Sequence, residues 1–162
     1  MPQVSTVPPE ALPQIPSALQ VEHRVIHEAL LRATKAPGDI GTAARELAGA
    51  LHDHFVREEE IALPPLGLLA ALARGEFTLE MRAVLPMTEA LRAELPRMLD
   101  EHQAIHAATR RLGEVARKAG NAEVQQLAGA LALHAQSEEE VFYPAALLVG
   151  EVVESRSQAH GS

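Results

Sequence analysis

Six of the eight histidines in the sequence, together with two glutamates, form four pairs with the same four-residue spacing. The second two pairs repeat the first two at an offset of 79 or 80 residues. Side chains four residues apart lie on one face of a helix, about 5–6 Å from each other, which suits them to bind one metal ion or two neighbouring ions. The pairs are His23 with His27, His54 with Glu58, His102 with His106, and His134 with Glu138.

The ligand types restrict the metal. Imidazole and carboxylate without thiolate suit iron, manganese or zinc, and the sequence has no cysteine, which excludes disulfides, iron–sulfur clusters and thiol catalysis. Six imidazoles and two carboxylates are more than one tetrahedral zinc ion uses, but they suit two octahedral ions. If Glu58 and Glu138 both bridge the ions, one oxo or hydroxo bridge completes six-coordination. The pattern therefore predicts a binuclear centre.

A simpler interpretation must be weighed against metal binding, since a single histidine on a helix is usually exposed or hydrogen-bonded. Here the pairs lie on or beside apolar stripes; His23, for example, is flanked by Leu19, Ile26 and Leu30. Burying such polar groups without partners would cost about 1–3 kcal/mol each, and a metal removes that cost. Other polar residues near the pairs are predicted to be solvated or to support the ligands: Glu59, Glu60, Glu139, Glu140 and His52. His160, in the C-terminal stretch, is assigned to no site.

The elements that would carry these residues are helices separated by proline and glycine. Five prolines in residues 1–16 predict an extended tail. Ser17 is the expected N-cap of a first helix that ends at Pro37-Gly38, and Asp39 that of a second helix over about 40–63. A short apolar helix is expected over residues 66–75, and a third long helix over about 88–119, with a kink at Pro96. Gly120 and Asn121 separate it from a fourth helix that ends near Phe142, before Pro144.

The repeat extends beyond the histidine pairs. Residues 47–61 resemble residues 127–141, and E-H-R-V-I-H at 22–27 resembles E-H-Q-A-I-H at 101–106. Because neither half alone can bury its apolar stripe, we expect an all-α fold over residues 17–150: an antiparallel up-down four-helix bundle built from two repeated helical hairpins. Residues 151–162 are expected to be a polar C-terminal tail. The apolar stretch from Ile61 to Leu72 would either cap the bundle, which we favour, or form a dimer face.

The composition excludes several classes of partner. A net charge of −8 argues against binding to nucleic-acid phosphates, and one tyrosine without tryptophan offers no platform for base stacking. No signal peptide and no apolar run of membrane-spanning length is recognised. A cytoplasmic protein without nucleic-acid or membrane partners is the expectation.

The four motifs resemble the hemerythrin family in its bacterial HHE cation-binding branch, over roughly residues 17–150. The segment H-F-x-x-E-E at 54–59 is especially close. The resemblance implies a non-haem di-iron centre that meets dioxygen or related small oxidants. It also implies His23 as the ligand from the first helix, and Glu58 and Glu138 as bridging ligands beside His54 and His134. His102 and His106 would be the pair of the third long helix.

One residue departs from this pattern. Oxygen-carrying hemerythrins have an apolar residue where this chain has His27, so that one iron keeps an open position. If His27 binds metal, which its repeat partner His106 favours, that position closes and oxygen carriage is disfavoured; otherwise the position stays open. Tyr143 lies either near the mouth of the site or in the packing around it.

Three functions compete at this stage. The first is a di-iron protein that binds, senses or stores O2, with manganese or zinc as possible substitutes for the two irons. The alternative is a di-iron stress enzyme acting on peroxide or nitric oxide. The third is a binding or regulatory module whose metal site senses iron or oxygen for a separate protein partner. A homodimer is the other protein association considered. The absence of cysteine disfavours the cysteine-bearing branch that repairs iron–sulfur clusters.

Overall fold

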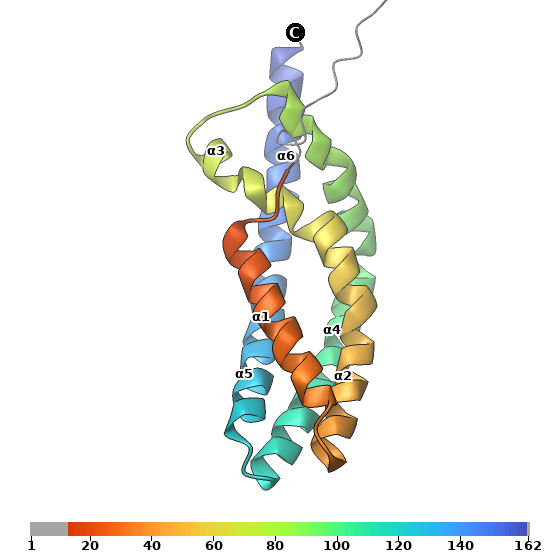
Figure 1. Ribbon diagram of the computed structural model, residues 1–162. Coiled ribbons are helices and arrows are strands. Elements are labelled where there is room, and N and C mark those ends of the chain that lie inside the picture. The colour runs from red at the N-terminus through yellow and green to blue at the C-terminus, as the bar shows by residue number, and fades with distance from the viewer. Residues whose placement is uncertain (1–12, 162) are drawn as a thin grey trace, which may run out of the picture.

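The computed structural model describes residues 13–161, and over that range it is entirely helical, with no strand. In Figure 1 the chain descends in α1, rises in α2, descends in α4 and rises again through α5 and α6. The long helices are α1 (Ser17–Thr34), α2 (Gly38–Arg57), α4 (Leu85–Lys118), α5 (Ala122–Ser137) and α6 (Tyr143–His160). The shorter elements between α2 and α4 are the π-helix η2 (Glu58–Ala62), the 3-10 helix η3 (Pro64–Leu68), α3 (Leu69–Ala73) and the 3-10 helix η4 (Leu79–Val84).

The helix starts follow the sequence signals only in part. Asn121 is the N-cap of α5, as predicted, and its side chain accepts a hydrogen bond from the Val124 amide at 3.0 Å. The expected caps of the first two helices were wrong. Pro16 and Pro37 occupy the cap positions of α1 and α2 without a side-chain cap. Asp39 instead lies in the first turn of α2, where its charge complements the helix dipole.

Two π-helical segments interrupt the long helices at equivalent places in the repeat. Each begins at the glutamate of a His–Glu pair: η2 at Glu58, and η5 (Glu138–Phe142) at Glu138. In η2 the Leu63 amide donates to the Glu58 carbonyl at 2.9 Å, a bond that spans five residues instead of four. The extra residue in the turn changes which side chains of the following segment face the core.

Apolar clusters lie on both sides of a buried polar layer. The lower cluster is shared by α1, α2, α4 and α5 and includes Leu47, Ile105 and Leu112. The upper cluster packs Leu63 and Leu66 against α4 and α6. The stretch from Ile61 to Leu72 therefore packs largely inward, in agreement with the predicted cap. Between the two clusters lie six buried polar side chains: His23, His54, Glu58, His102, His134 and Glu138.

The C-terminal end differs from the expected polar tail. The fourth helix was expected to end before Pro144, but the chain stays helical there. Pro144 lies in the first turn of α6, where its missing amide hydrogen is not needed. The helix continues to His160, and Val149 and Val153 are buried against the α3 and η4 region. The predicted boundary near residue 150 therefore lies inside a helix. The proposed tail at residues 1–16 falls almost entirely outside the described residues.

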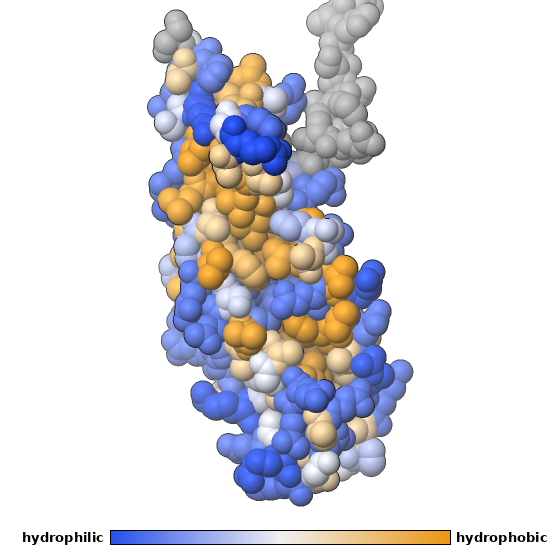
Figure 2. Space-filling view, turned by 90° about the vertical axis from the view of Figure 1, so that its left-hand side faces the viewer, coloured by the Kyte–Doolittle hydropathy of each residue, from blue (hydrophilic) through white to orange (hydrophobic). Residues whose placement is uncertain are grey.

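The surface carries both apolar and hydrophilic side chains. Figure 2 shows apolar side chains gathered mainly over the upper half of one face, with hydrophilic side chains at both ends of the molecule. Within residues 13–161, no helix is both long enough and apolar enough to cross a membrane.

Candidate metal centre

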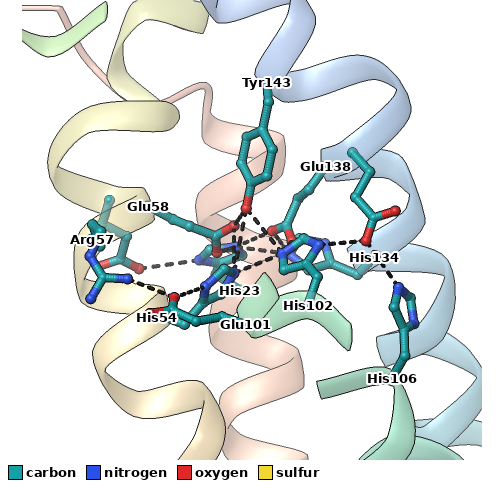
Figure 3. A network of polar contacts seen from close by, with 12 residues as sticks. His23, His54, Arg57, Glu58, Glu101, His102, His106, His134, Glu138 and Tyr143 are labelled. Atoms are coloured by element: carbon teal, nitrogen blue, oxygen red, sulfur yellow. Dashed lines mark hydrogen bonds and ion pairs between the residues drawn. The ribbon is translucent and has the colours of Figure 1, made fainter. Parts of the chain in front are cut away.

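Six of the eight predicted ligands converge in the buried polar layer, and they form two groups that share both glutamates (Figure 3). Within each group, one potential ligand atom per residue lies within 4.8 Å of the others. The first group is His23, His134, Glu58 and Glu138. The second is His54, His102, Glu58 and Glu138.

Each group pairs a histidine from one half of the chain with a histidine from the other. The Nε2 atoms of His23 and His134 are 2.9 Å apart, and those of His54 and His102 are 2.8 Å apart. Metal–imidazole bonds of about 2.0–2.1 Å at right angles place neighbouring ligand atoms about 3 Å apart. The spacing of both histidine pairs therefore fits ligands of a common ion.

The two glutamates reach both histidine pairs. Glu138 places Oε1 at 2.6 Å from His134 Nε2 and Oε2 at 3.3 Å from His102 Nε2. Glu58 places Oε1 at 3.2 Å from His54 Nε2 and Oε2 at 3.9 Å from His23 Nε2. Each glutamate therefore directs one carboxylate oxygen toward each histidine pair. Glu58 Oε2 is buried and has no hydrogen-bond partner among the described residues, a cost that a bound cation would remove.

Each of the four histidines also has a carboxylate at its other ring nitrogen. Metal-binding histidines typically make such a contact, which fixes the ring orientation and the tautomer. Three of these contacts are hydrogen bonds at Nδ1: His23 with Glu59 (3.3 Å), His54 with Glu101 (3.0 Å) and His102 with Glu139 (2.7 Å). His134 Nδ1 lies 3.2 Å from Glu22 without forming a hydrogen bond.

Sequence reasoning missed two of these four carboxylates. Glu59 and Glu139 were already expected to be solvated or to support ligands, but Glu22 and Glu101 were assigned no role. The signal was present, because each directly precedes a histidine of the repeated E-H-x-x-I-H segment. Arg57, also unassigned, donates to Glu101 at 2.6 Å and holds that carboxylate in place.

The buried carboxylates of the polar layer favour a bound cation. Burial alone would lower the pKa of His134, but the hydrogen bond and charge of Glu138, with the charge of Glu22, raise it to about 9. Burial would raise the pKa of Glu138, but hydrogen bonds from His102, His134 and His23 bring it well below its ordinary value. Burial and the neighbouring charge of Glu138 raise the pKa of Glu58. In the metal-free protein, protons on the histidines thus balance the negative charge of the buried carboxylates. Bound metal ions would otherwise balance that charge.

His27 belongs to none of the groups of potential ligands found within residues 13–161, whereas His106 forms a third, less buried group with His102 and Glu139. His27 is exposed and lines a cavity of about 580 Å³ between α1 and α2, together with His23 and Phe55. His106 is half-buried, and its Nε2 lies 3.1 Å from Glu139, the carboxylate that also contacts His102. His52, expected on a different face from His54, is exposed. Metal binding by His27 and His106 remains a prediction, and the arrangement does not depend on it.

Tyr143 lies inside the polar layer. Its side chain descends from α6 onto the ligand atoms (Figure 3) and is 1 % exposed. The hydroxyl donates to Glu58 and lies 3.1 Å from His102 Nε2 and 3.4 Å from His54 Nε2. Burial and the charge of Glu58 raise the pKa of the phenol. The packing role that sequence alone left open is therefore not its only role.

Comparison with family models matches residues 14–146 to the hemerythrin HHE cation binding domain. No curated protein and no solved structure matches the chain. The family match covers most of the chain, and the buried cluster of histidines and glutamates is a candidate site for the cation. The chain belongs to the hemerythrin HHE cation-binding domain family.

Proposed function

We propose that this protein holds two iron ions, one in each histidine pair, and uses them to bind, sense or store O2 or a related small oxidant. The observation that carries the proposal is that Glu58 and Glu138 each reach both histidine pairs. Carboxylate and imidazole donors without thiolate suit iron, and manganese or zinc are the alternative occupants. Bound iron would supply redox chemistry and coordination positions for an external ligand.

The number of protein ligands would leave coordination positions open on each ion. Each group offers two imidazole nitrogens and two carboxylate oxygens, whereas an octahedral ion takes six ligands. His27, which would close one position, is exposed and lies outside both groups. External ligands therefore have positions to occupy.

A small cavity adjoins the proposed ligands. A cavity of about 10 Å³ lies beside the histidines, walled by Leu51, Phe55, Ile105 and Leu131. That volume is close to the minimum for one water-sized molecule. The polar part of the wall consists of proposed ligands, His54, His102, His134 and Glu138, so the cavity lies directly against the ligand atoms. Carboxylates hydrogen-bonded to Nδ1 of His23, His54 and His102 keep the Nε2 atoms of these rings aimed inward.

We further infer that the bundle is two copies of one antiparallel hairpin design. In support, equivalent residues of the two halves take equivalent roles: His23 and His102, Glu58 and Glu138, and the two π segments that start at those glutamates.

A second candidate is an enzyme that consumes peroxide or nitric oxide. The cavity between α1 and α2 favours it, because a wide approach to His23 suits repeated entry of substrate and exit of product. Turnover above that of free iron would support this candidate, and no turnover would remove it.

Metal analysis together with an optical spectrum tests the main proposal. Two irons per chain with a diferric absorption spectrum are expected, and about one zinc per chain without colour would overturn it. Exposure of the reduced protein to O2 then separates the roles. A reversible optical change supports binding, and irreversible oxidation removes the carrier version.

A further inference from the structure

Tyr143 breaks the equivalence of the two halves of the centre. The repeat that relates Glu58 to Glu138 relates Leu63 to Tyr143, at the same offset of 80 residues. Both side chains are buried, with 1 % exposed in each case. Leucine has no atom that could bind a metal, whereas tyrosine offers an oxygen. Only one of the two groups therefore receives an additional donor from this position.

The phenol oxygen lies among the ligand atoms of the second group. It is 3.1 Å from His102 Nε2 and 3.4 Å from His54 Nε2, and it contacts Glu58 Oε1. The ligand atoms of that group are separated by similar distances: 2.8 Å between the two imidazoles, and 3.2 Å between His54 and Glu58. Neighbouring ligands of one octahedral ion are about 3 Å apart.

We propose that Tyr143 is a fifth protein ligand of the ion held by His54 and His102, and that it binds as a phenolate. The inference rests on the proposed metal centre. The ion held by His23 and His134 lacks this ligand and has the α1–α2 cavity beside it. External molecules would then bind at the His23 side, and the phenolate would stabilise the ferric state of the other ion.

The competing role for Tyr143 is a hydrogen-bond donor to Glu58 that stays protonated when metal binds. Spectroscopy separates the two roles unambiguously, because Tyr143 is the only tyrosine of the sequence and there is no tryptophan. Any phenolate signal from the protein belongs to this residue.

The experiment loads the full chain with ferric iron and records visible absorption and resonance Raman spectra. We expect a phenolate-to-iron charge-transfer band with tyrosinate ring vibrations. Tyr143→Phe should lose the band while keeping two irons per chain. The control is Phe142→Leu, which removes the adjacent, half-buried ring and should keep the band.

A second measurement on the unmodified chain covers the case in which Tyr143→Phe does not fold. Loading with zinc should shift the near-ultraviolet absorption by the amount expected for one ionised tyrosine per chain. Two bound metals without any phenolate signal overturn the role of Tyr143 and leave the proposed centre intact. A chain that binds no pair of metals overturns the proposed function and this inference with it.

Discussion

At the scale of single residues, the shared glutamates hold the site together. Glu58 is fully buried and lies next to one histidine of each pair, His54 and His23. Glu58→Ala should reduce bound metal from two ions to fewer than one per chain, because both ions lose a ligand, and it should destabilise the fold through the buried imidazoles left without a partner. Metal analysis after dialysis, together with thermal unfolding, measures both effects.

His27→Ala is the matched control for this change, since His27 is an exposed histidine of the same motif set. Retention of two metals in His27→Ala is expected. Loss of one metal would show that His27 binds after all, and that the centre is closed as its repeat partner His106 suggested.

The outer carboxylates make a separate prediction. Glu101 lies 3.0 Å from His54 Nδ1 and receives hydrogen bonds from Arg57 and Arg97. Glu101→Gln should weaken metal binding by roughly 10- to 100-fold, the usual effect of removing a carboxylate that orients a metal-binding histidine. Competition with a chelator measures the affinity. Asp100→Asn, an exposed neighbour, serves as the control, and an equal loss in both variants would contradict the role of Glu101.

At the scale of elements, close packing of α6 on α4 sets a limit on side-chain size. A Cβ added at Gly150 would meet Thr88 Oγ1 at 2.4 Å and Thr88 Cβ at 2.7 Å. Gly150→Ala should therefore destabilise the protein by about 1–3 kcal/mol, as overpacking of a core typically does. Denaturant unfolding at fixed metal loading measures the change.

An exposed glycine within α5 gives the opposite expectation. Gly129 has nothing within 4 Å of an added Cβ, so Gly129→Ala should stabilise the helix by about 0.5–1 kcal/mol. Destabilisation by both substitutions would mean that helix geometry, and not the contact with Thr88, controls the effect.

The elements also show which features sequence could predict. The helical fold and the six converging residues followed from the four-residue spacing and its repetition, because that spacing fixes a helix face. The π segments at Glu58 and Glu138 did not, since one extra residue in a turn leaves no mark in composition. Tyr143 could not be placed for the same reason: its direction depends on the turn that precedes it. The predicted N-caps Ser17 and Asp39 were wrong because both helices begin earlier, with Pro16 and Pro37 at the N-cap positions.

At the scale of the whole molecule, metal and protons compete for the same nitrogen atoms, and this makes stability depend on pH. In the metal-free protein the pKa of His134 is raised from 6.5 to about 9, mainly by Glu138 once the opposing effect of burial is overcome. A raised pKa in the folded state stabilises the fold fully below the unfolded value, and that contribution is lost as the pH rises through about 9. It amounts to about 3 kcal/mol at most.

The metal-loaded protein should behave differently, because a nitrogen that binds metal carries no proton and metal affinity grows as protons leave. The unfolding free energy of the metal-free chain should therefore fall between pH 6.5 and 9, while the gain on adding metal increases over the same window. Denaturant titrations with chelator and with metal measure both curves. His134→Gln should make the metal-free curve less steep, since glutamine has no proton to lose, while His23, His54 and His102, whose pKa values are also raised, keep the remaining slope. A metal-free curve that stays flat or rises in the unmodified chain would mean that Glu138 does not hold a proton on His134, and that the buried layer balances its charge in another way.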